Sequence, residues 1–168
     1  MKQLFLPKNV SVFINSPFDQ SPVEEFDVDE DNQYFCSING IIYSKDMKIL
    51  YAFPQYKNIT SYIVPNTVET IAEAALTRFV YLERIVIADS VTDILPGFLY
   101  RANDKIKEVI IFRGYYQKKP NIVSTAFEYS NFKMENITYI YSSQIPKSCK
   151  FQFRFSMMSS YLYVFISL

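Results

Sequence analysis

A repeated pattern of apolar and polar positions runs along most of the chain. Four apolar anchors are each followed five positions later by a second bulky apolar residue: Phe13 and Phe18, Ile71 and Leu76, Ile94 and Leu99, and Ile122 and Phe127. Each copy continues with two apolar residues separated by one position, as in Ile85 and Ile87, which is the spacing of one face of a β-strand. Because 49% of the residues are hydrophobic, apolar residues match at a fixed spacing easily by chance. The alignment of the four copies therefore needs support from rarer residue types.

Turn-forming residues provide that support, because a five-residue turn segment ends three residues before each of three anchors. Residues 64–68 (VPNTV) and 6–10 (LPKNV) carry Pro and Asn, and residues 87–91 (IADSV) carry Asp and Ser in the same place. These residue types favour tight turns. The fourth copy departs from the pattern, because residues 114–120 (GYYQKKP) lengthen its loop and place Lys119 where valine is expected.

A unit of this length, with one strand and one turn, cannot bury its own apolar face and must stack on its neighbours. We therefore expect the strands to lie side by side in one parallel sheet, with short helical or irregular turns such as residues 72–79 along the opposite flank. The predicted strands are residues 4–6, 26–28, 62–64, 85–87, 109–111 and 137–139.

The repeats are interrupted between about residues 29 and 60. Asn39-Gly40 lies between two apolar runs and predicts a two-residue β-hairpin, because both central residues of a type I′ turn need positive φ. A second polar turn, residues 44–48 (SKDMK), precedes the apolar run 49–53. These segments predict a three-stranded antiparallel meander inserted between parallel repeats.

Residues 26–54, together with YIVPNTVETIAEAAL (62–76) and LERIVIADSVTDI (82–94), resemble the BspA-like leucine-rich repeat proteins. The resemblance implies an α/β fold, a right-handed leucine-rich repeat solenoid over residues 1–141, and no catalytic residue. Such proteins occur on the surfaces of bacteria and parasitic protists and are associated with adhesion to host proteins or other cells. The chain departs from the family's Ala-Phe pair at Phe98-Leu99, which lacks the alanine.

The residue types exclude most common catalytic sites. The absence of histidine removes Ser-His-Asp, Cys-His and HExxH chemistry, and three dispersed glycines cannot form a P-loop or a GxGxxG loop. Paired carboxylates leave no motif, so a glycosidase arrangement is not excluded in this way. The chain has 17 basic and 17 acidic residues, so no net charge favours nucleic acid. We expect a non-enzymatic protein without a cofactor.

Two further motifs bear on metal binding and redox state. Asp27, Asp29 and Asp31 match the first half of an EF-hand loop, but Asn32 replaces its glycine and Ile38 its bidentate glutamate. We therefore expect weak or absent calcium binding. The two cysteines, Cys36 and Cys149, form no CxxC motif, and whether they pair is left open.

The ends of the chain leave its location open. Pro7 and Lys8 interrupt the apolar N-terminus, so no signal peptide is apparent, although three glycosylation acceptors (Asn9, Asn58 and Asn136) hint at secretion. Residues 142–168 form an apolar tail that we interpret as a cap or edge strands in preference to a membrane segment. A surface or secreted module is favoured; an intracellular scaffold, or a fragment of a longer repeat protein, is the alternative.

Outward-facing positions of the predicted sheet give a candidate protein-binding strip of mixed charged and apolar residues. Its members are Arg84, Val86, Glu108, Ile110, Asn136 and Thr138. A host or cell-surface protein is the expected partner. Two alternatives compete with this interpretation: Arg84 and Glu108 merely pair across adjacent strands, or the loop around Tyr115 and Tyr116 is the binding site.

Overall fold

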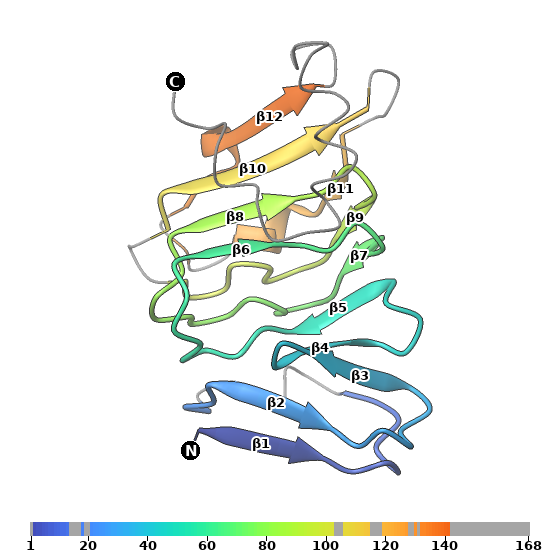
Figure 1. The fold of residues 1–168 in the computed structure, drawn as a ribbon. Coiled ribbons are helices and arrows are strands. Elements are labelled where there is room, and N and C mark those ends of the chain that lie inside the picture. Colours follow the sequence, from blue (N-terminus) through green and yellow to red (C-terminus); the bar gives the residue numbers. More distant parts are fainter. Residues whose placement is uncertain are drawn as a thin grey trace, which may run out of the picture.

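The chain folds into stacked rows of short strands, as Figure 1 shows. The computed structural model describes residues 2–13, 18, 21–102, 106–114, 119–127, 130 and 132–141. Within these residues the strands form three sheets, of two, four and six strands. The helical elements of this part of the chain are two short 3-10 helices, η1 (Ser124–Phe127) and η2 (Met134–Asn136).

The four-stranded sheet consists of repeat strands only. Its strands are β6 (Ser61–Ile63), β8 (Arg84–Ile87), β10 (Glu108–Arg113) and β12 (Ile137–Tyr141). All neighbours are parallel, and Tyr62, Ile85, Val109 and Ile137 occupy one row across the sheet. The predicted strands and their relative register are therefore confirmed for these copies, including the copy with the longer loop.

The first two predicted strands form a sheet of their own. β1 (Gln3–Leu6) and β2 (Glu25–Val28) pair in parallel but do not join the four-stranded sheet, so the prediction of one continuous parallel sheet is wrong. The cause lies in the segment that follows β2. The Phe26 N–H donates to the Gly40 carbonyl at 2.9 Å, so a hairpin turn occupies the place where the next parallel strand would pair.

The six-stranded sheet lies on the other flank. It joins the antiparallel strands β3 (Phe35–Ile38), β4 (Ile41–Ser44) and β5 (Ile49–Ala52) to three parallel two-residue strands. These are β7 (Thr70–Ile71), β9 (Asp93–Ile94) and β11 (Asn121–Ile122). The anchors Ile71, Ile94 and Ile122 face one another in register, which confirms their alignment, but a sheet on this flank was not predicted.

Irregular turns follow these short strands, as expected for residues 72–79. Positive φ angles of 53° at Ala74 and 50° at Arg78 interrupt any helical run between β7 and β8. The described part of the chain thus consists almost wholly of β-strands and turns. It contains two short 3-10 helices and no α-helix, so the α part of the predicted α/β class is not found there.

The hairpin prediction is confirmed. Ile38 pairs with Ile41, and the two residues between them have φ angles of 51° (Asn39) and 72° (Gly40). Gly40 is needed for a second reason, because a Cβ atom at this position would lie 2.8 Å from the Cβ of Glu25 in β2. After β4, the Ser44 hydroxyl accepts hydrogen bonds from the amides of Lys48 and Ile49, which turns the chain into β5 and completes the meander.

Two main hydrophobic cores result. The larger one lies between the four-stranded and six-stranded sheets and is built mostly from aliphatic side chains, with Leu50, Ile71, Leu82, Ile85, Ile87 and Leu99 all fully buried. The smaller one belongs to the N-terminal region and is rich in aromatic rings: Phe26 and Phe35 are buried, and Phe13, Phe18 and Tyr51 pack against them.

Three of the sequence predictions fall outside the described residues. They concern the tail 142–168, the loop at Tyr115 and Tyr116, and the pairing partner Cys149. Among the residues that are described, no helix is long and apolar enough to cross a membrane.

Candidate protein-interaction surface

The outward face of the four-stranded sheet carries the predicted binding residues in rows. One outward row runs across the sheet through Ile63, Val86, Ile110 and Thr138. A second outward row lies two positions earlier along the strands and contains Ser61, Arg84 and Glu108. Asn136 ends η2 immediately before β12 and is exposed. The structure therefore places five of the six predicted residues on adjacent strands, and the sixth at the start of the last one.

The middle of this strip is not open to solvent. Val86 is 3% exposed and Ile110 is 1% exposed, so the expectation that both face water is wrong. With Phe112 and Ile140 they form a third hydrophobic cluster, separate from the core inside the sheets.

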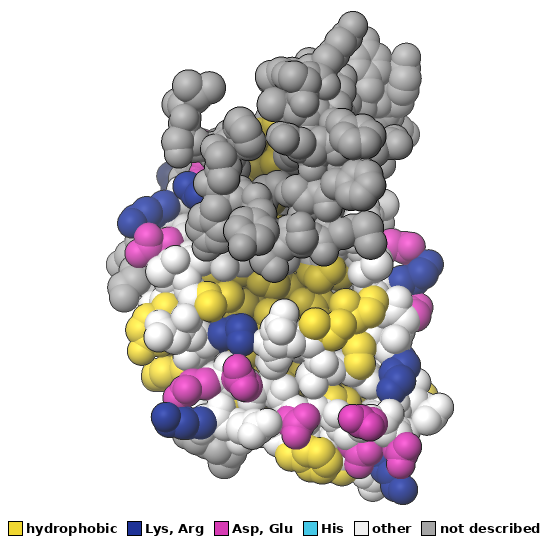
Figure 2. All heavy atoms as spheres, viewed as in Figure 1, with side chains coloured by type: hydrophobic (Ala, Val, Ile, Leu, Met, Phe, Trp, Pro, Cys, Tyr) yellow, Lys and Arg dark blue, Asp and Glu magenta, His cyan; other side chains and the backbone are white. Residues whose placement is uncertain are grey.

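The ends of the same row remain accessible. Ile63 on β6 is 44% exposed, and Thr138 on β12 is exposed. Figure 2 shows hydrophobic side chains gathered across the middle of the view, at the level of β6, with charged side chains to either side. Ile63 and Thr138 are thus accessible on this face, whereas Val86 and Ile110 between them are buried.

Charged residues pair across the strand starts. Arg84 Nε lies 2.6 Å from Glu108 Oε2, and Lys107 Nζ lies 2.7 Å from Glu83 Oε2. Arg84 and Glu108 thus form the cross-strand ion pair that the alternative interpretation expects. Because the Arg84 and Glu108 side chains are 43% and 29% exposed, the pair is still accessible to a partner.

The backbone sets the positions of these charges. The amides of Glu83 and Arg84 both donate to the Thr60 carbonyl, and those of Lys107 and Glu108 both donate to the Glu83 carbonyl. Each strand is thereby held in the same register as the strand before it. The acidic and basic side chains at the strand starts line a shallow depression of about 240 Å³. Thr60 and Ser61 complete its wall.

The acidic segment 24–31 does not gather its carboxylates. Glu25 and Asp27 are exposed positions of β2, and Asp29 Oδ1 accepts a hydrogen bond from the Asp31 amide within its own turn. No group of three His, Cys, Asp or Glu side chains that could hold a metal ion occurs among the described residues.

Asn32 has a structural role that its sequence position did not reveal. It is 0% exposed, and its Nδ2 donates to the carbonyls of Pro7 and Val10 at 3.1 and 3.0 Å. Its Oδ1 accepts from the amides of Tyr34 and Phe35, each at 2.8 Å. The side chain thus ties the segment after β1 to the start of β3, and every one of its hydrogen-bonding groups is used.

Two buried tyrosines link the meander to the repeats. The hydroxyls of Tyr43 on β4 and Tyr62 on β6 lie 2.8 Å apart. Burial raises the pKa of Tyr43 to about 12 and also raises the pKa of Tyr62 well above its ordinary value. Neither residue was singled out from the sequence, because nothing local marks two tyrosines 19 positions apart as partners.

Arg113 is another buried polar residue that the sequence did not single out. It is 3% exposed, and its Nη1 donates to the carbonyls of Asp89 and Val91 at 3.2 and 3.1 Å. Removal of the guanidinium from water lowers its pKa, while the nearby Tyr139 opposes that change. Arg113 therefore braces the turn after β8 from the end of β10.

No protein-family model matches the chain, and no curated protein sequence does either. Three solved structures share its fold. The pneumococcal vaccine antigen PcpA is 26% identical with a TM-score of 0.61, over 67% of this chain and 30% of that protein. A leucine-rich repeat protein from Eubacterium ventriosum is 18% identical with a TM-score of 0.54, over 77% of this chain and 41% of that protein.

The third structure is a leucine-rich cell surface protein from Faecalibacterium prausnitzii, which is 17% identical with a TM-score of 0.53, over 86% of this chain and 49% of that protein. The chain therefore spans less than half the length of each of the three proteins. With its stacked parallel strands and few helices, the described part of the chain thus shares the leucine-rich repeat fold of these structures.

Proposed function

We propose that the chain is a non-catalytic protein-recognition module of the BspA-like leucine-rich repeat type, displayed at a cell surface or secreted, with a role in adhesion. The observation that carries the proposal is the four-stranded parallel sheet whose rows hold charged and apolar side chains in register on one outward face. The likeness to a vaccine antigen and to a cell surface protein supports the location.

The proposal includes the right-handed solenoid that the sequence resemblance implies. The alternation of strands between the four-stranded and six-stranded sheets supports it, because β6, β8 and β10 fall in one sheet and β7 and β9 in the other. In a solenoid each repeat contacts only the neighbouring repeats, so the stack forms one extended surface. A partner can therefore contact several repeats at once.

Within this module the proposed contact surface is the outward strip of β6, β8, β10 and β12. Its accessible members are Ile63, Arg84, Glu108, Asn136 and Thr138, whereas Val86 and Ile110 are buried. An exposed apolar residue next to a charged pair suits a protein partner, because interfaces combine an apolar centre with a polar rim.

A binding experiment with matched variants tests the surface. Partners would be captured from host-cell or cell-surface extracts with the intact chain and then measured individually by surface plasmon resonance. We expect Ile63→Asp with Arg84→Glu to weaken binding by at least about tenfold, as loss of a contact worth about 1.4 kcal/mol would. Lys48→Glu with Glu69→Lys exchanges an exposed ion pair on the opposite flank and serves as the control.

Both variants must keep the thermal unfolding midpoint of the parent chain for the comparison to count. If the Ile63 and Arg84 variant binds like the parent while Tyr115→Ala with Tyr116→Ala abolishes binding, the strip is not the site. Surface protease shaving of intact cells tests the location separately, since a displayed module is cleaved and an internal one is protected.

A further inference from the structure

A pocket of about 160 Å³ lies where the two main cores meet. Phe18, Phe26 and Tyr51 line it from the aromatic N-terminal core, and Phe53, with Ala75, lines it from the aliphatic core of the repeats. Half-buried Phe13 and exposed Glu73 stand at its margin, so the pocket reaches the surface. It is distinct from the strip on the four-stranded sheet, with which it shares no residue.

The walls of the pocket are aromatic rings already packed on one another. The ring centroids of Phe18 and Phe26 are 4.7 Å apart, and those of Phe13 and Phe18 are 5.2 Å apart with the planes at 72°. Aromatic pairs prefer such separations and tilted arrangements. An aromatic ring entering the pocket would extend this network.

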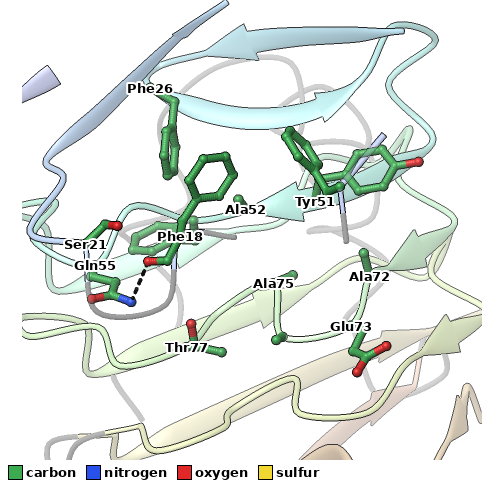
Figure 3. Close-up of a pocket in the computed structure, with 13 residues that line it drawn as sticks. Phe18, Ser21, Phe26, Tyr51, Ala52, Gln55, Ala72, Glu73, Ala75 and Thr77 are labelled. Carbon is green, nitrogen blue, oxygen red and sulfur yellow. Dashed lines mark hydrogen bonds between the residues drawn. The ribbon is translucent and has the colours of Figure 1, made fainter. Parts of the chain in front are cut away.

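One end of the pocket is polar. Gln55 and Thr77 line it and are each 6% exposed. Figure 3 shows the Gln55 amide, the Thr77 hydroxyl and Ser21 near one end, with the rings of Phe18 and Phe26 beyond them. Gln55 Nε2 is already used, because it donates to the Phe18 carbonyl at 3.2 Å. The Gln55 Oε1 and Thr77 Oγ1 atoms make no hydrogen bond among the described residues, so they can accept one from a ligand.

From these features we propose that the pocket binds one phenol ring, carried by a free phenolic compound or by a tyrosine side chain of a peptide. The size fits, because an apolar cavity of about 150 Å³ accommodates a benzene ring. The ring lies among the aromatic walls, and its hydroxyl exchanges a hydrogen bond with the Thr77 hydroxyl at the polar end. A plain hydrocarbon would leave that buried hydroxyl without a partner, which costs affinity.

The test is calorimetric titration of the intact chain with p-cresol and with toluene, which has the same ring and methyl group but no hydroxyl. We expect saturable one-to-one binding of p-cresol, stronger than that of toluene by about threefold to tenfold, the value of one net hydrogen bond. Absence of saturable p-cresol binding, or equal binding of the two compounds, overturns the proposal.

Two variants examine the two ends of the pocket. Ala52→Leu adds a larger side chain to its apolar wall and should weaken p-cresol binding by more than about tenfold. Thr77→Val removes a hydroxyl at the polar end while keeping the shape, and should bring the affinities for p-cresol and toluene within about twofold of each other. Unchanged p-cresol binding by a folded Ala52→Leu variant contradicts the assignment.

A further measurement covers the case in which Ala52→Leu fails to fold. Backbone amide shifts of the parent chain should change on p-cresol addition at residues 51–55 and 72–77, and shifts confined elsewhere would place the ligand outside the pocket. The peptide acetyl-Gly-Tyr-Gly-amide distinguishes the two sources of the ring. If it competes with p-cresol, a tyrosine of a protein partner is the ligand; if it does not, a free phenolic compound is.

Discussion

The N-terminal region, β1 to β5, and the repeats, β6 to β12, are stabilised in different ways. In the N-terminal region individual polar residues hold particular turns, as Asn32 and Gly40 do, and aromatic rings fill the core. In the repeats the same kind of aliphatic side chain recurs in each successive strand, and each strand takes its register from the strand before it. Stability is therefore concentrated in a few residues in one region and distributed over many in the other.

The largest expected effect is in the repeats. Ile85 is fully buried between Tyr62 and Val109 of the adjacent strands, so Ile85→Ala removes contacts on both sides and leaves a cavity. We expect a loss of about 4 kcal/mol in the free energy of unfolding, measured by urea denaturation. Hydrogen exchange should show the loss of protection spread over β6, β8 and β10.

Ile63→Ala, at the 44% exposed position of the same sheet, is the matched control, with an expected loss under about 1 kcal/mol. Equal losses at the two positions would mean that burial within the rows does not determine repeat stability.

The second prediction concerns the N-terminal region. Asn32→Leu has nearly the same size but leaves the Pro7 and Val10 carbonyls and the Tyr34 and Phe35 amides without their partner. We expect a loss of about 3 kcal/mol, because each buried unpaired group costs about 1 to 3 kcal/mol and relaxation recovers part of the total. Amide exchange should accelerate in β1 to β3 and change little in β8 and β10.

Asn66→Leu, in an exposed turn of the repeats, should alter the free energy of unfolding by less than about 0.5 kcal/mol. If the Asn32 variant loses protection uniformly along the chain, the two regions unfold as one unit and the contrast between them fails.

The tyrosine pair tests the connection between the regions. Tyr43→Phe leaves the Tyr62 hydroxyl buried without its partner and should cost about 1 to 2 kcal/mol at pH 7. The double variant with Tyr62→Phe removes both hydroxyls and should lose less than the sum of the single variants. A strictly additive result would show that the hydroxyls do not interact.

The same pair predicts a dependence on pH. The pKa of Tyr43 is about 12 in the folded chain and 10.0 in its ordinary state, so the unfolded chain loses this proton first. The stabilising contribution is complete below pH 10 and is lost as the pH rises toward about 12. The free energy of unfolding, measured at pH 8 to 11.5, should fall less steeply in the double phenylalanine variant than in the parent chain.

The smallest effect is expected for the surface ion pair. Arg84→Met, Glu108→Gln and their double variant form a cycle from which the coupling energy follows. We expect a coupling under about 1 kcal/mol that decreases in 1 M salt, because both groups are partly exposed. The Lys107 and Glu83 pair, in which the lysine is 70% exposed, should couple more weakly still. A larger coupling in the second pair would contradict the role given to burial.

Repetition explains what could be predicted from the sequence. The spacing of Ile85, Val109 and Ile137 indicated strands in one register, because each row must present the same face to the same core. Asn39-Gly40 indicated the hairpin through local backbone chemistry alone. The second sheet was not predicted, because strands of two residues such as β7 are too short to show an alternating pattern.

Contacts between distant segments explain what could not be predicted. The two carbonyls that accept from Asn32 Nδ2 lie 22 and 25 residues before it, and a local motif search compared Asn32 only with a calcium loop. The prediction that Val86 and Ile110 point away from the inner core was correct, because they belong to a separate cluster. Their alternation along the strand nevertheless did not predict that they are buried. The pocket depends on Phe13 and Phe18 meeting Phe53 and Ala75, which no spacing in the sequence indicates.

The stacking of β6, β8, β10 and β12 also has a mechanical consequence. Hydrogen bonds between strands lie across the strand direction, so they point along the axis on which the rows are stacked. A pulling force along that axis loads one row of bonds at a time and peels strands off singly, at low force and over a long extension. A tethered molecule built in this way would lengthen under load and absorb a sudden pull, where a sheet loaded along its strands would resist until it broke all at once.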